Sequence, residues 1–125
     1  MNSQSKGRRI ATWILTILIG LLFIASAIAK FMAASEVIQA AEKWGLRDHL
    51  MLIAVGELVS VLLFLIPRTN SLGVLLLSAY MGGAIVTHMQ NAEPYYTQAV
   101  LLLLIWVAGY LRHPELLQSF RAAQD

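Results

Sequence analysis

Six residues of this chain have reactive side chains in an unexpected position, because each lies in or beside a long apolar run. They are a carboxylate, an ammonium group, a phenol, an imidazole and two hydroxyls: Glu57, Lys30, Tyr80, His88, Ser26 and Thr87. Groups of these types donate hydrogen bonds and exchange protons. If the apolar runs bring them together, they form a polar pocket inside a largely apolar protein.

The composition excludes several other kinds of chemistry. The 125 residues are 58% hydrophobic and 13% charged, whereas about a quarter of the residues of a typical soluble domain are charged. There is no cysteine, which excludes disulfides, thiolate nucleophiles and cysteine-bound metals. The net charge of +2 and the lack of a basic patch argue against nucleic acid as a partner. The histidines lie on separate segments without ligand spacing, so we predict no metal site.

Four apolar runs are long enough to cross a lipid bilayer. At about 1.5 Å per residue, a helix of about 20 residues matches a hydrocarbon core of roughly 30 Å. We therefore predict an all-α fold, an integral membrane four-helix bundle. It is a single domain over residues 1–125, with spans at about residues 10–30, 50–66, 72–89 and 95–111. A cleaved signal peptide is the alternative for the first run, but that run exceeds the usual signal core of about 7–15 residues.

A more polar stretch separates the first two spans. Ser35 has the chemistry of a helix N-cap, and Val37, Ala41 and Trp44 recur at the spacing of one helix face. Gly45 is suited to ending that helix. The sequence therefore predicts a short amphipathic surface helix, with Trp44 at the level of the lipid headgroups.

Four spans place both termini on the same side of the membrane, and the distribution of positive charges indicates which side that is. The side with the termini carries six basic residues: Lys6, Arg8, Arg9, Arg68, Arg112 and Arg121. The other side carries three, which acidic neighbours offset: Lys30, Lys43 and Arg47. Because positive loops stay in the cytoplasm, we predict a multi-pass protein of the bacterial cytoplasmic membrane, the cell membrane, with both termini cytoplasmic.

The helical rise gives each polar group a depth in the membrane. Lys30 ends the first span at the outer face, and His88 lies almost at the outer end of the third span. Glu57 and Tyr80 lie about 10 and about 13 Å below the outer ends of their spans. An ionised carboxylate facing lipid at mid-helix costs about 2.5–3.5 kcal/mol. Glu57 is therefore expected to face the bundle, where it is paired, protonated or hydrated.

The order of several short segments resembles one family of membrane proteins. The segments are Ser26-Ala27-Ile28-Ala29-Lys30, Gly56-Glu57-Leu58, Pro67-Arg68, Tyr80-Met81-Gly82-Gly83-Ala84 with His88, and Trp106 with Leu111-Arg112. Together they resemble the DoxX-like membrane proteins over roughly Ile10 to Pro114. This resemblance implies a four-helix membrane bundle and an association with quinone-linked redox systems, or a role as an accessory or assembly factor. Relatives that handle disulfides need cysteine, which this chain lacks.

We therefore expect an accessory subunit that binds a quinone-like or other amphiphilic, lipid-like molecule in the outer half of the bundle. It holds that ligand for a redox partner, has no intrinsic cofactor and lies in the lipid bilayer. The expected ligand-binding residues are Ser26, Lys30, Glu57, Tyr80, Thr87, His88 and Trp106. No catalytic residue is assigned, because no self-contained catalytic motif is present.

Three other functions stay open on the sequence. The chain is a non-catalytic scaffold or assembly factor for a membrane protein partner, in which case the polar cluster only sets the helix register. Alternatively, it is a small-molecule transporter that works as a homo-oligomer. A lipid-modifying acid/base enzyme is disfavoured, because Glu57 and His88 differ by about 10 Å in depth.

Overall fold

The computed structural model describes residues 5–118, and these residues form helices and turns without a strand. In chain order the helices are α1 (Lys6–Phe31), α2 (Ser35–Trp44), the 3-10 helix η1 (Arg47–His49), α3 (Leu50–Leu65), the 3-10 helix η2 (Pro67–Thr69), α4 (Asn70–Gln90) and α5 (Tyr96–Arg112). The predicted all-α class is confirmed. Two α-helices are longer than their predicted spans at both ends, and α3 ends one residue early.

The start of α1 shows why a boundary moved. Its predicted span begins at residue 10, but the helix begins at Lys6 because Ser5 caps it: the Ser5 Oγ accepts a hydrogen bond from the Arg8 N–H at 3.1 Å. The Ser35 cap was wrong by one residue. Ser35 is already helical, and Ala34 occupies the N-cap position without a side-chain hydrogen bond. Gly45 ends α2 as predicted, at φ 73°, a conformation that favours glycine.

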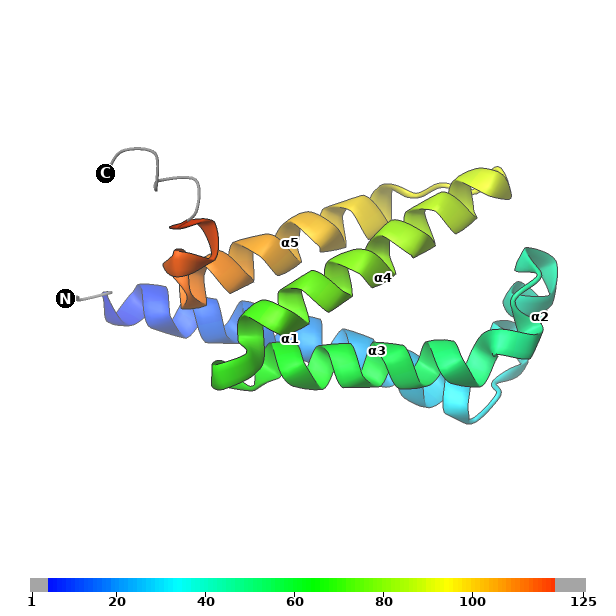
Figure 1. Ribbon diagram of the computed structural model, residues 1–125, viewed down its shortest axis with the longest axis horizontal. Helices are drawn as coiled ribbons and strands as arrows, with labels where there is room; N and C mark the ends of the chain where they lie inside the picture. The colour runs from blue at the N-terminus through cyan, green and yellow to red at the C-terminus, as the bar shows by residue number, and fades with distance from the viewer. Residues whose placement is uncertain (1–4, 119–125) are drawn as a thin grey trace.

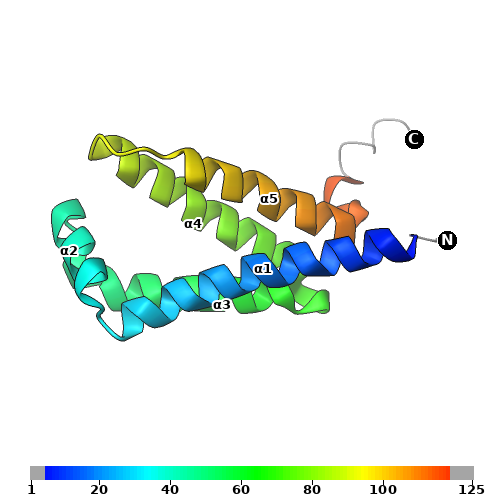
Figure 2. The ribbon, with the colours of Figure 1, turned by 180° about the vertical axis from the view of Figure 1, so that it is seen from behind.

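Two helix pairs form the bundle. The first pair, α1 with α3, and the second, α4 with α5, lie side by side, and α3 also packs on α4. At one end, where α1 begins and α5 ends, the pairs are in contact, while toward the other end they diverge (Figure 1). There α2 lies across the open end, and the view from behind shows the same arrangement (Figure 2).

An apolar core joins the two pairs in the closed part of the bundle. Each long helix contributes to it, and its members are Ile19, Phe23, Val61, Phe64, Val74, Leu77, Met81, Ile105 and Ala108. The turn between α3 and α4 is especially tight. A Cβ atom at Gly73 would lie 2.1 Å from the Phe64 backbone nitrogen, so only glycine allows this approach. Burial of this core holds the diverging ends at a fixed angle.

The outer faces of the long helices are apolar as well. Leu18, Leu52 and Leu103 are each more than 60% exposed, which is typical of a surface that faces lipid. Within residues 5–118, three stretches are long and apolar enough to cross a membrane: Lys6–Phe31, Arg47–Leu65 and Pro67–Gln90. The fourth predicted span, α5, is an apolar helix of 17 residues and is shorter than these.

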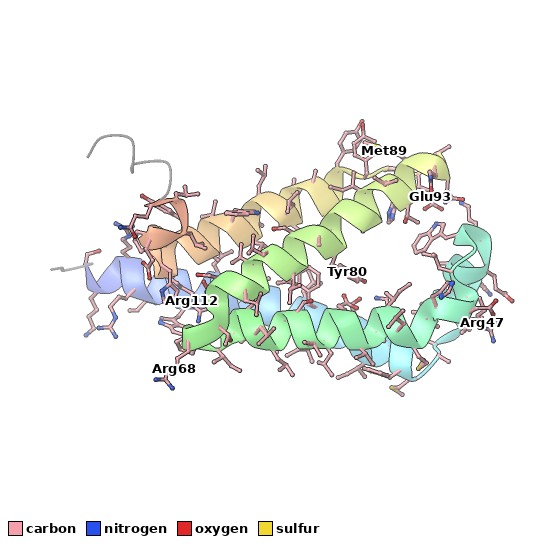
Figure 3. All side chains as sticks on the ribbon, viewed as in Figure 1. Arg47, Arg68, Tyr80, Met89, Glu93 and Arg112 are labelled. Carbon is pink, nitrogen blue, oxygen red and sulfur yellow. The ribbon has the colours of Figure 1, made fainter. Side chains whose placement is uncertain are left out.

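Arg112 joins three helices at the closed end of the bundle, where the two helix pairs are in contact. It lies at the end of α5, and its guanidinium donates hydrogen bonds to the Phe64 and Leu65 carbonyls at 2.7 and 2.9 Å. These carbonyls belong to the last turn of α3, which has no helical donor for them. The same guanidinium lies 4.7 Å from the centre of the Trp13 ring on α1. One side chain thus joins α1, α3 and α5 (Figure 3).

Candidate ligand-binding site

A buried ion pair joins α1 to α3 in the half of the bundle where the two helix pairs diverge. The Lys30 Nζ donates to the Glu57 Oε1 at 2.8 Å and to the Ser26 Oγ at 2.7 Å. Ser26 precedes Lys30 by one helical turn, so both side chains lie on the same face of α1. The Glu57 side chain is 1% exposed and that of Lys30 is 16% exposed. Of the three states expected for the Glu57 carboxylate, the structure therefore has the paired one.

Tyr80 brings α4 to this ion pair. Its ring centre lies 5.8 Å from the Lys30 Nζ, within the range of a cation–π contact. The Phe23 ring of α1 meets the Tyr80 ring edge to face, with centres 6.2 Å apart. Figure 3 shows Tyr80 pointing from α4 into the space between the two helix pairs. Lys30 is thus the point at which α1, α3 and α4 converge.

Next to Lys30 and Tyr80, a cavity of about 590 Å³ lies between α3 and α4 and is covered by α2. Most of its wall is apolar, with aliphatic side chains such as Val37, Leu50 and Ile53. Its polar groups are Lys30 and Tyr80 at the end near the ion pair, which we call the inner end, and Glu36, Thr87 and His88 toward the end that α2 covers, which we call the outer end. The cavity is therefore amphiphilic: hydrogen-bond donors are separated by an apolar wall.

His88 lines the cavity at the end that α2 covers. Its Nδ1 lies 2.7 Å from the Ala84 carbonyl, which only accepts, so Nδ1 carries the proton. The Nε2 then faces the Gln98 amide nitrogen at 3.4 Å and the Glu93 carboxylate at 4.0 Å. The Trp44 ring of α2 lies against the His88 ring, with centres 5.1 Å apart. His88 thus links α4 to α2.

Glu93, in the turn between α4 and α5, binds two side chains of α2, the helix that covers one end of the cavity. Its carboxylate accepts a hydrogen bond from the Trp44 Nε1 at 3.0 Å and forms an ion pair with Lys43. The hydrogen bond from Lys43, with a smaller contribution from Trp44, holds the pKa of Glu93 below its ordinary value. In Figure 3, Glu93 points from the tip of the α4–α5 pair toward the end of α2. Glu93 therefore helps to hold α2 over this end of the cavity.

The structure divides the seven expected ligand-binding residues into three groups. Lys30, Tyr80, Thr87 and His88 line the cavity. Ser26 and Glu57 hold Lys30 in place from behind. Trp106 lies elsewhere: its Nε1 donates to the Ser78 Oγ at 2.7 Å and so ties α5 to α4.

The sequence analysis missed several residues of the cavity region, among them Glu36 and Trp44, which both line the cavity. The position of Trp44 at the level of the lipid headgroups stays a prediction. Glu93 was a turn residue, and its partners Lys43 and Trp44 lie about 50 residues earlier in the chain. In the sequence, Glu93 is indicated only by its type and place: it is an acidic residue in a turn predicted to lie on the same side of the membrane as Lys43.

The model of a protein family described as the DoxX-like family matches residues 14–109. This range covers Ser26 through Trp106 and includes Glu93. No curated protein and no solved structure matches the chain.

Proposed function

Because the chain belongs to the DoxX-like family, we propose that it binds a membrane-soluble amphiphile, a quinone in the first instance, in the cavity beneath α2. The family and the apolar helices make it a membrane protein. In the proposed role it is an accessory subunit that presents the quinone to a redox partner. We assign electron transfer to that partner because the sequence has no cysteine pair and no flavin-binding motif.

The proposed orientation has four spans, with α5 as the fourth, and both termini in the cytoplasm of a bacterium. The beginning of α1 and the end of α5 lie at the same end of the bundle, which supports it (Figure 2). The chain has no native cysteine, so single cysteines report the topology directly. We expect a membrane-impermeant maleimide to label Glu42→Cys in intact cells and Ser71→Cys only after permeabilisation. The reverse pattern contradicts this orientation.

One observation carries the proposal: an amphiphilic cavity with an ammonium group at its inner end. Two of the three Lys30 N–H groups donate to Ser26 and Glu57, and in the proposed complex the third donates to a ligand oxygen. A quinone carbonyl is such an acceptor, and the Tyr80 hydroxyl is a second polar group at the same end of the cavity. The volume of about 590 Å³ lies within the range of roughly 300–1,000 Å³ for small-molecule sites.

Tryptophan fluorescence tests the proposal, because Trp44 lines the cavity and quinones quench indole emission on contact. Trp13 and Trp106 lie outside it, so they report only unspecific quenching. We expect decylubiquinone to quench the wild-type protein saturably in nanodiscs and the Trp44→Phe variant only in proportion to its concentration. Equal, unsaturable quenching of both proteins contradicts the proposal.

A paired substitution tests the role of the ammonium group. Lys30→Met with Glu57→Leu removes both charges together and keeps similar side-chain volumes, so the bundle does not retain an unpaired charge. We expect decylubiquinone binding to weaken roughly tenfold or more, since a hydrogen bond to a charged group contributes about 1.5–3 kcal/mol. Unchanged affinity in a folded variant excludes Lys30 from the binding site.

A scaffold role is the second candidate, and the hydrogen bonds that Lys30 donates within α1 and to α3 favour it. Lys30 donates to both Ser26 and Glu57, so these residues fix the register of α1 against α3 without any ligand. In this case the paired substitution lowers the yield of folded protein, and a defined membrane protein co-purifies with the chain. Crosslinking in membranes followed by mass spectrometry identifies that partner, and its absence contradicts the scaffold.

A further inference from the structure

The boundaries of the cavity determine how a ligand reaches it. Its outer end is covered by α2, which Glu93 fastens through Trp44 and Lys43. Its inner end is closed by the Lys30–Glu57 ion pair and by Tyr80. The core residues that join the two helix pairs lie beyond that end. A further boundary is the seam between α3 and α4, in the half of the bundle where the two helix pairs diverge.

Two glycines lie along this seam, one on each helix. Gly56 of α3 and Gly83 of α4 both line the cavity, and both are exposed. A Cβ atom built on either glycine would meet nothing within 4 Å. Neither glycine is therefore needed for close packing of the helices, unlike Gly73 in the same α3–α4 hairpin. Both leave space between the helices free.

The helical periodicity places these glycines between the cavity and the lipid. At about 100° per residue, positions three or four apart share a helix face. On α3, Gly56 lies between the cavity residue Ile53 and Val59, which is 47% exposed. On α4, Gly83 lies between the cavity residue Thr87 and Val86, which is 51% exposed. Each glycine thus marks the edge at which its helix turns from the cavity to the bilayer.

We propose that the cavity opens sideways into the bilayer between Gly56 and Gly83, and that it takes a tailed amphiphile through this opening. The head of the ligand lies against Lys30 and Tyr80. Its acyl or isoprenyl tail runs out between the two glycines and stays in the hydrocarbon core. This inference rests on the proposed function and adds the ligand class and the route: a lipid-resident molecule whose tail is needed for tight binding.

A sideways opening explains why the cavity has polar groups at its inner end while its other end is covered by α2. A molecule that enters from water has to release α2, which the Glu93 contacts oppose. A molecule dissolved in the bilayer passes only the small side chains of the seam, and its tail never leaves the apolar medium. The free-energy cost of entry is therefore smaller from the bilayer than from water.

A matched pair of substitutions on α4 tests the opening. Gly83→Leu places an isobutyl group in the seam. Gly82→Leu, one residue earlier, is the control, because a Cβ at Gly82 also meets nothing within 4 Å and Gly82 does not line the cavity. The probes are decylubiquinone and the same quinone ring without a tail, and the readout is saturable quenching of Trp44 in nanodiscs. Comparing variants with the same probe cancels the partitioning of that probe into lipid.

We expect Gly83→Leu to weaken decylubiquinone binding roughly tenfold or more, because several methylene groups lose their binding surface. The tail-free ring is expected to bind this variant within about twofold of wild type, and Gly82→Leu to leave both probes unchanged. Gly56→Leu is expected to repeat the effect from the α3 side.

Three results overturn the inference, and they differ from one another. If Gly83→Leu weakens both probes equally, the leucine fills the head site and the tail has no route through the seam. If it weakens neither, the seam is not an entrance, even though the cavity binds the ring. If neither probe quenches Trp44 saturably in the wild-type protein, the proposed function itself fails and the opening fails with it.

Discussion

Glu57→Gln isolates the energetics of the buried ion pair. The variant keeps the size of the side chain but leaves the Lys30 ammonium without a counter-charge, since the partners are 2.8 Å apart and the Glu57 side chain is 1% exposed. With charge centres roughly 3.5 Å apart and an effective dielectric constant of about 20, the lost attraction is about 5 kcal/mol. Removal of one partner from buried pairs typically destabilises by about 3–5 kcal/mol. We therefore expect a loss within that range.

The assay is reversible unfolding in mixed micelles, with helix content as the signal and the fraction of denaturing detergent as the variable. Glu42→Gln is the control, because the Glu42–Arg47 pair has a similar length of 3.1 Å but side chains that are 60% and 50% exposed. Exposed pairs contribute less than about 1 kcal/mol. The paired substitution Lys30→Met with Glu57→Leu is expected to recover most of the stability, because it leaves no charge unpaired.

Two results would refute this reasoning. One is a Glu57→Gln variant no less stable than Glu42→Gln, which means that the carboxylate is not buried with the lysine. The other is a paired variant as unstable as the single one. In that case the loss comes from packing around residue 57 and not from an unpaired charge.

Three further predictions concern other parts of the bundle. Gly73→Ala is expected to destabilise by about 3 kcal/mol or more, because its Cβ would lie 2.1 Å from backbone of Phe64; the same unfolding assay measures it. Arg112→Ala is expected to cost about 2–4 kcal/mol, since two charged hydrogen bonds to the last turn of α3 are lost. Because the pKa of Glu93 is lowered from 4.5, its contacts stabilise α2 above that pH and are lost as the pH falls through the lower folded value. Hydrogen exchange, corrected for intrinsic rates, should show α2 opening there, and Glu93→Gln should open it at neutral pH.

Each of these predictions has an outcome that contradicts it. Gly82→Ala controls for the loss of a helical glycine, and equal effects at both positions remove the steric argument for Gly73. Arg112→Lys keeps the charge but cannot donate the same two hydrogen bonds at once. Full stability of that variant therefore contradicts a role for the paired guanidinium hydrogen bonds to α3. Exchange in α2 that does not respond to Glu93→Gln shows that other contacts hold the helix.

Two physical limits in the sequence place Glu57 within reach of Lys30, although they do not decide between a paired, a protonated and a hydrated carboxylate. The helical rise gives Glu57 a depth within reach of Lys30, and the cost of an unpaired carboxylate in lipid excludes an outward position. The structure brings the two together at 2.8 Å. Gly45 was predictable for a similar reason, since a left-handed conformation at a helix end favours glycine.

The sequence could not predict the position of α2. Its amphipathic pattern indicates a helix with one apolar face, and both the membrane surface and a protein cavity satisfy that pattern. The choice depends on the angle between the helix pairs, which is set by core packing between residues far apart in the chain. For this reason the sequence did not indicate that Trp44 lines the cavity or that Glu93 contacts Lys43.

Trp106 illustrates a second limit. Its position on α5 indicates a face that meets other helices, but not which one. No residue of α5 lines the cavity, and Trp106 contacts Ser78 of α4 instead. The hydrogen bond from the Trp106 Nε1 to the Ser78 Oγ depends on tertiary packing alone.

The most direct test of the account is to identify what the protein carries out of the membrane. The wild-type chain, purified in a mild detergent, is extracted with organic solvent and analysed by mass spectrometry beside the paired Lys30→Met/Glu57→Leu variant. We expect one tailed quinone or similar amphiphile per chain at roughly stoichiometric amount in the wild type, and little of it in the variant. A wild-type protein with no such molecule above the detergent background contradicts the account.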